Sequence, residues 1–125
     1  MTHAWRILVV EDEPDGQEVV MDILDYYEIP SVAVASAEDA LKRLSREQFD
    51  GLVVDLALPG MDGFGLLRTI RGDARFAALP CIACTAFHTS MVRKEALEAG
   101  FNAYFPKPLD DHAFVRELKR LIQKE

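Results

Sequence analysis

The chain has 125 residues, half of them hydrophobic and 28% charged, which is typical of one globular domain with a substantial core. Its formal net charge of −7 argues against direct binding to nucleic acid, since no excess of basic residues is available to meet phosphates. No stretch reaches the roughly 18 apolar residues of a membrane-spanning helix, and the first apolar strand begins too early to follow a signal peptide, so we expect a cytoplasmic protein without membrane association.

The first part of the chain alternates apolar strands with amphipathic helices. Residues 6–10 form a continuous apolar run, as expected of a strand covered on both faces, and Pro14 then favours the start of a helix. Residues 31–35 predict a weaker strand, suited to the edge of a sheet. Ser36 with Asp39 resembles a capping box at the start of a second helix. The pattern is therefore strand, helix, strand, helix.

The second part of the chain repeats this alternation three times. Three short apolar runs are each followed by a residue that can cap a helix, and then by apolar residues at helical spacing. Gly72 and Gly100 mark the ends of the first two of these helices. The expected strands cover residues 52–54, 81–85 and 103–105, and the expected caps are Asp62, Thr89 or Ser90, and Asp110 or Asp111.

Five strands that alternate with five helices predict an α/β fold of the (βα)5 type. We expect a single domain over residues 1–125, with no output domain in this chain. Right-handed crossovers make such a sheet parallel and place helices on both of its faces. The carboxyl ends of the strands then lie along one edge, where open α/β sheets bind their ligands. We therefore expect the functional side chains to follow the strand ends.

Cys81 and Cys84 form a C-x-x-C pair, a spacing that also occurs in redox and metal sites. Here both cysteines lie on a predicted strand, where residues three apart point to opposite faces of the sheet. Neither a disulfide nor shared metal ligation fits that arrangement. We expect two small thiols buried in the core.

Acidic residues, a hydroxyl and a lysine follow the ends of the predicted strands. Glu11 and Asp12 come after the first strand, Asp55 after the third, Thr85 ends the fourth, and Lys107 follows the fifth. Crowded carboxylates repel one another unless a cation is present, and an all-oxygen cluster suits Mg²⁺, which often shares its shell with a phosphate. The lysine and the hydroxyl would complete a clamp for phosphoryl oxygens. Asp55 is then either a metal ligand only or a nucleophile that takes the phosphoryl group.

Four segments together resemble the receiver domain of response regulators from two-component, His–Asp phosphorelay systems, including the chemotaxis regulators. The resemblance covers essentially the whole chain, with the segments in the family's order and spacing. It implies the flavodoxin-like strand order 2-1-3-4-5. The segments run from Ile7 to Pro14, from Val54 to Gly63, over Thr85 and Ala86, and from Tyr104 to Pro108.

The resemblance implies a role for each acidic residue. Asp55 corresponds to the phosphoacceptor, and Glu11 and Asp12 correspond to the acidic pair that binds Mg²⁺, with Mn²⁺ as an alternative. Asp12 would bind the metal directly and Glu11 through water. Ala57, two residues after the phosphoacceptor, would offer its backbone carbonyl. The implied metal site is therefore Glu11, Asp12, Asp55 and the Ala57 carbonyl.

The same resemblance assigns the residues around the phosphoryl group. Thr85 would donate its hydroxyl to that group, and Lys107 would pair with it. The Lys107–Pro108 peptide bond would be cis. Tyr104 corresponds to the switch aromatic, which in the family turns inward when the threonine moves toward the phosphate. Phosphorylation would thereby change the surface near Tyr104.

The implied function is a signalling switch that catalyses no reaction beyond its own phosphorylation and dephosphorylation. A sensor histidine kinase or a histidine phosphotransfer protein would supply the phosphoryl group. A downstream protein partner would bind the face formed by the fourth helix, the fifth strand and the fifth helix. No direct nucleic acid partner and no membrane partner are expected.

Two other functions remain open from the residues alone. An aspartyl-phosphate phosphohydrolase of the haloacid-dehalogenase type also uses a nucleophilic aspartate on a parallel sheet. That class places a second aspartate two residues later, where this chain has Ala57, and it expects a cap insertion for which 125 residues leave no space. The other alternative is a binding module that is never phosphorylated; intact Asp12, Asp55 and Lys107 count against it.

Overall fold

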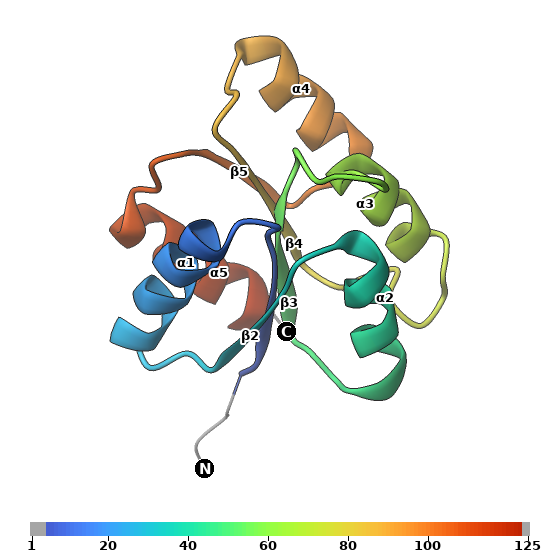
Figure 1. The fold of residues 1–125 in the computed structure, drawn as a ribbon, viewed down its shortest axis with the longest axis horizontal. Coiled ribbons are helices and arrows are strands. Elements are labelled where there is room, and N and C mark those ends of the chain that lie inside the picture. The colour runs from blue at the N-terminus through green and yellow to red at the C-terminus, as the bar shows by residue number, and fades with distance from the viewer. Residues whose placement is uncertain (1–4, 124–125) are drawn as a thin grey trace.

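The computed structural model describes residues 5–123, where five strands alternate with five helices as predicted (Figure 1). Both ends of the predicted 1–125 domain, residues 1–4 and 124–125, lie outside the described part. No helix within residues 5–123 combines the length and the apolar content needed to cross a membrane. The elements are β1 (Ile7–Val10), α1 (Pro14–Tyr26), β2 (Ser31–Val34), α2 (Ala37–Arg46), β3 (Gly51–Asp55), α3 (Gly63–Arg71), β4 (Cys81–Thr85), α4 (Ser90–Ala99), β5 (Ala103–Pro106) and α5 (Asp111–Gln123).

The five strands form one sheet in the order β2-β1-β3-β4-β5, and each neighbouring pair is parallel. This confirms the predicted fold class and strand order. β2 lies at an edge, as its weaker apolar pattern indicated, while β1, β3 and β4 are enclosed between neighbours. The carboxyl ends of all five strands therefore lie along one edge of the sheet.

Helices cover both faces of the sheet, which explains why the central strands are apolar along most of their length, up to Asp55 at the end of β3 and Thr85 at the end of β4. α1 and α5 lie on one face, and α2, α3 and α4 lie on the other (Figure 1). Along β1, Leu8 and Val10 pack toward α2 and α3, while Ile7 and Val9 pack toward α1 and α5. All four side chains are buried. Burial of each such side chain contributes about 2 kcal/mol.

The predicted starts of α2, α3, α4 and α5 are confirmed by hydrogen bonds from backbone N–H groups to the capping side chains, while α1 begins at Pro14 without a side-chain cap. The structure resolves the two ambiguous starts in favour of Thr89 for α4 and Asp110 for α5, and Gly100 ends α4 in the left-handed conformation, with a φ of 119°. The side-chain oxygens of Ser36, Asp62, Thr89 and Asp110 accept from the N–H groups of Asp39, Gly65, Val92 and Ala113 at 3.0, 2.8, 3.0 and 3.1 Å.

Four of the five predicted strands differ from the structure by one residue at one or both ends. β2 ends at Val34 rather than at residue 35, and β3 covers Gly51–Asp55 rather than residues 52–54. β1 begins at Ile7, because the N–H of Arg6 donates to the Asp50 carboxylate at 2.8 Å instead of joining the sheet. β5 continues to Pro106, because the backbone pairing with β4 extends as far as Thr85. The extra residue of β5 keeps the backbone paired with β4 as far as Pro106, the residue directly before Lys107.

Cys81 and Cys84 point to opposite faces of the sheet, as predicted. Cys81 belongs to the core cluster under α2 and α3, and Cys84 belongs to the cluster under α1 and α5. Both thiols are free and buried. The C-x-x-C spacing therefore serves packing on both sides of β4.

Candidate functional site

Four of the predicted site residues meet at the carboxyl edge of the sheet. Glu11 and Asp12 follow β1, Asp55 is the last residue of β3, and Lys107 follows β5. Glu11 is only 3% exposed and Asp55 only 6%. The cavity they form has a volume of about 200 Å³, and its lining residues are Glu11, Asp12, Glu13, Asp55, Ala57, Ala86, Phe87 and Lys107.

Lys107 joins the two buried carboxylates. Its Nζ lies 2.5 Å from Glu11 Oε1 and 3.1 Å from Asp55 Oδ2. Burial alone would lower the pKa of this ammonium, but the hydrogen bond to Glu11 and the negative charges of both acids outweigh burial and raise its pKa. Lys107 therefore stays charged and offers one fixed positive charge to the site.

Asp55 is oriented by contacts to both of its carboxylate oxygens. Oδ1 accepts a hydrogen bond from the N–H of Ala57 at 3.0 Å, while Oδ2 contacts Lys107. The Lys107–Pro108 peptide bond is cis, as the resemblance implies. The contacts with Ala57 and Lys107 hold the Asp55 carboxylate in one orientation, where it lines the cavity.

The acidic residues exceed the positive charge available to them. Glu11, Asp12 and Asp55 each offer a carboxylate oxygen, and these three oxygens all lie within 4.8 Å of one another. Burial raises the pKa of Glu11; the hydrogen bond from Lys107 opposes this rise, and the charge of Asp55 adds to it. Three carboxylates facing one ammonium form an all-oxygen site that fits a hard divalent cation such as Mg²⁺.

Thr85 and Tyr104 lie beside the site, on β4 and β5. The Thr85 hydroxyl accepts a hydrogen bond from the N–H of Phe87 at 3.0 Å. Tyr104 is only 5% exposed, and its hydroxyl lies 2.8 Å from Nδ1 of His88. Arg93, on α4, stacks over the same ring at 5.9 Å. Tyr104 is thus buried in the core, where it contacts His88 in the β4–α4 loop and Arg93 on α4.

Comparison with known proteins identifies this arrangement. A family model described as the response regulator receiver domain matches residues 7–119, which is most of the chain. The chain belongs to the response regulator receiver family. Receiver domains take part in two-component signalling, so the resemblance seen in the sequence is confirmed.

Individual relatives of this receiver domain match over nearly their full length. The chemotaxis protein CheY of Pseudomonas aeruginosa is 31% identical over 95% of this chain and 97% of the relative. An uncharacterized 14.6 kDa protein of Leptolyngbya boryana is 39% identical over 94% of this chain and 87% of the relative. The receiver domain of a sensor histidine kinase from Pseudomonas aeruginosa superimposes with a TM-score of 0.88 at 32% identity, over 98% of this chain and 100% of that one. That structure contains a magnesium ion in its active-site cleft.

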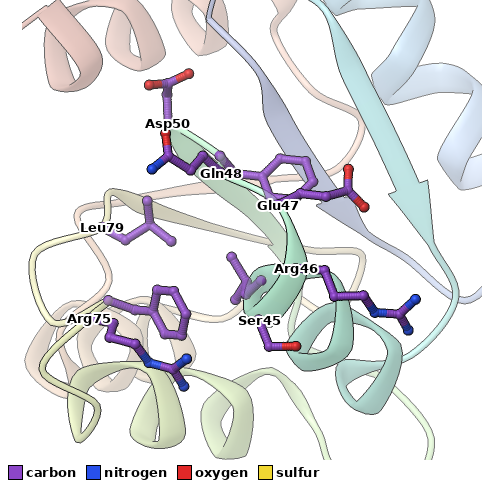
Figure 2. A pocket seen from close by; sticks show the side chains of 10 residues that line it. Ser45, Arg46, Glu47, Gln48, Asp50, Arg75 and Leu79 are labelled. Atoms are coloured by element: carbon purple, nitrogen blue, oxygen red, sulfur yellow. The ribbon is translucent and has the colours of Figure 1, made fainter.

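A larger cavity of this receiver domain lies at the opposite edge of the sheet. Its volume is about 450 Å³, and it is bounded by the end of α2 and the segments that precede β3 and β4 (Figure 2). Phe49 and Phe76 contribute apolar surface, and Arg46, Glu47 and Arg75 contribute charged groups. None of the predicted site residues lines this cavity.

Sequence reasoning missed two residues that shape the site of this receiver domain. Glu13 lines the cavity and donates its N–H to Glu11 Oε2 at 3.4 Å. Gly16, in the first turn of α1, lies against the Glu11 side chain. A third acid after Glu11 and Asp12 was a visible signal for the first. A glycine inside a predicted helix was a signal for the second.

Proposed function

We propose that this receiver domain, spanning residues 1–125, is a switch that accepts a phosphoryl group on Asp55. The observation that supports this most directly is the place of Asp55 at the end of β3. One carboxylate oxygen contacts Lys107, and two further acids lie within metal-binding distance. A nucleophilic carboxylate needs the positive charges of Lys107 and of a bound metal ion, because the incoming phosphoryl group is itself anionic.

The chemistry is transfer of a phosphoryl group between a partner's histidine and Asp55. The P–N bond of the donor phosphohistidine breaks and its electron pair returns to the imidazole, while a new P–O bond forms to an Asp55 oxygen. Lys107 offsets negative charge on the phosphoryl oxygens, and Thr85 donates its hydroxyl to one of them. Glu11 through water, Asp12, Asp55 and the Ala57 carbonyl would hold Mg²⁺, which would supply a Lewis acid for these oxygens.

We propose a sensor histidine kinase or a histidine phosphotransfer protein as the donor. For output, we propose that a downstream protein binds the face formed by α4, β5 and α5. Met91 is 65% exposed at the start of α4, and Glu95 is exposed on the same helix. Val115, on α5, is buried and contributes nothing to this face, and Tyr104 is also buried. The proposed face therefore rests on α4 more than on α5.

Intact-protein mass spectrometry tests the phosphoacceptor. The wild type, incubated with acetyl phosphate and Mg²⁺, should gain one phosphoryl group. Asp55→Asn should gain none, because an amide cannot attack the donor. Glu13→Gln is the matched control: it changes an acid that lines the same cavity, and it should still be phosphorylated. Equal phosphorylation of wild type and Asp55→Asn would refute the proposal.

A further inference from the structure

The acidic pair of this chain begins with glutamate, whose side chain is one methylene longer than that of aspartate. Glu11 is nevertheless almost completely buried, at 3% exposure. Its carboxylate is bound on both sides, by Lys107 on Oε1 and by the N–H of Glu13 on Oε2. A longer side chain that reaches the same site must fold back on itself, and the folded part needs space.

Gly16 provides that space. A Cβ atom built on Gly16 would lie 2.7 Å from Glu11 Cδ, 2.9 Å from Oε1 and 3.0 Å from Cγ. A Cβ atom essentially never lies within 3.0 Å of an atom to which it is not bonded, so any larger residue at position 16 forces the glutamate to move. The carboxylate of Glu11 thus occupies the volume that a side chain of Gly16 would fill.

The backbone gives no other reason for glycine at this position. Positive φ angles are found at Gly60 and Gly100 among the described glycines, and not at Gly16. Glycine is also a poor helix former, and Gly16 lies within α1. A glycine that disfavours its own helix and needs no special φ is explained by packing against a neighbouring group.

The start of α1 cannot easily move away from Glu11. The Gln17 side chain donates to the backbone carbonyl of Glu11 at 2.8 Å, and the Gln17 N–H donates to the carbonyl of Glu13 at 2.9 Å. These bonds tie the first turn of the helix to the end of β1. A methyl group at position 16 would therefore displace the carboxylate of Glu11 rather than the helix.

We infer that Gly16 is a positioning residue for the metal and phosphoryl site, matched in size to the glutamate at position 11. It acts through Glu11, whose carboxylate it lets reach Lys107 and the acidic cluster. The inference rests on the proposed function, because the cluster matters only where a metal binds. Its physical content, a steric match between positions 11 and 16, can be tested without metal or phosphoryl group.

A double-mutant cycle tests the match, with Gly16→Ala, Glu11→Asp and the two combined. The first readout is the ¹H–¹⁵N signal of the Lys107 side-chain ammonium in metal-free protein, which reports its contact with Glu11. The second is Mg²⁺ affinity by calorimetry. Gly65→Ala is the control, because Gly65 also lies in the first turn of its helix. Its Cβ would crowd the flexible side chain of Met61, with Cγ at 2.9 Å, and would make ordinary contacts with Asp62 Oδ1 at 3.5 Å and Arg68 Nη2 at 3.7 Å, none of which belongs to the acidic cluster.

Gly16→Ala should shift the Lys107 ammonium signal and weaken Mg²⁺ binding about tenfold, as expected when a partner of a metal ligand is disturbed. In the Glu11→Asp background the same change should alter affinity less than about twofold, because the shorter acid leaves room for the methyl group. Gly65→Ala should match the wild type in both readouts. Rescue by the shorter acid separates positioning from a general loss of structure.

The inference would be overturned if Gly16→Ala weakened Mg²⁺ binding equally in the Glu11 and Glu11→Asp backgrounds. It would also be overturned if Gly16→Ala left the Lys107 ammonium signal unchanged in the Glu11 background. Failure of both Gly16→Ala proteins to fold would also overturn it, since crowding by Glu11 would then not be the cause. Absence of Mg²⁺ binding in every protein, the wild type included, would instead refute the metal part of the proposed function. The Lys107 signal would still decide the role of Gly16.

Discussion

Asp12 is the most accessible of the three clustered acids, since Glu11 and Asp55 are both buried. Removing its charge relieves repulsion within the cluster but takes away the carboxylate best placed for direct metal binding. Asp12→Asn should therefore raise metal-free stability by about 0.5 to 1 kcal/mol and largely abolish Mg²⁺ binding. Urea unfolding and calorimetry measure the two effects. Asp15→Asn, in the first turn of α1 outside the cluster, should leave Mg²⁺ affinity unchanged; wild-type affinity in Asp12→Asn would contradict the assignment.

The two cysteines should respond to pH in a defined direction. Burial raises the pKa of Cys81 to about 11 and that of Cys84 to about 12, from an ordinary value of 9.0. As the pH rises, the two thiols therefore lose their protons in the unfolded chain before they lose them in the folded protein. The stability that the thiols contribute is complete below about pH 9, the unfolded value, and is lost as pH rises toward the folded values. At pH 8, iodoacetamide should label both thiols slowly in native protein and rapidly in urea; rapid native labelling would contradict their burial.

At the scale of elements, one arginine connects the end of α3 to the segments around α4. Arg71 donates to the carbonyls of Ala77, Leu79 and Gly100 at 3.2, 2.8 and 3.0 Å. It also donates to the Asn102 side chain at 2.9 Å, and Asn102 in turn accepts from the N–H of Cys81. The α3–β4 segment and the start of β5 are thus held by one side chain.

Arg71→Met should destabilise the protein by about 2 kcal/mol, because it keeps most of the aliphatic stem and removes hydrogen bonds from a charged donor. Arg68→Met, one turn earlier on the same helix and exposed, should change stability by less than about 0.5 kcal/mol. Urea unfolding compares the two. A loss for Arg71→Met no larger than that for Arg68→Met would show that this network contributes little.

The β4–α4 segment connects the site to the proposed output face. The Thr85 hydroxyl now bonds to the N–H of Phe87, so a move toward a phosphoryl group must break that bond and disturb the start of α4. Beryllofluoride with Mg²⁺, a phosphoryl mimic, should shift the amide signals of α4 and β5 in wild type and in Thr85→Ser. Thr85→Ala should bind the mimic with little response in α4. A full response in Thr85→Ala would exclude this route.

At the scale of the whole molecule, the sequence was sufficient for the fold because the fold depends on periodic burial. The apolar strands, most of the helix caps and the parallel pairing follow from patterns that run along the chain, whereas the strand order 2-1-3-4-5 came from the resemblance to the receiver family. The clustering of Glu11, Asp12, Asp55 and Lys107 followed as well, since parallel strands bring their carboxyl ends together.

Other features depend on contacts between residues that no local pattern connects. The Tyr104–His88 hydrogen bond joins two elements, and the burial of Val115 depends on how α5 is rotated against the sheet. The fit of Gly16 against Glu11 depends on the angle at which α1 leaves β1. These details shape the site and the surface around it. They could not be predicted from the sequence, because they depend on how the helices pack against the sheet in three dimensions.

The central claim is that Asp55 itself carries the phosphoryl group, and chemical mapping tests it most directly. Borohydride reduces an aspartyl phosphate to homoserine, which marks the modified residue in a peptide digest. After treatment with acetyl phosphate and Mg²⁺, homoserine should appear at position 55, and Asp55→Asn should yield none. Homoserine at position 12, at position 62 or at any other aspartate, with position 55 unmodified, would contradict the account.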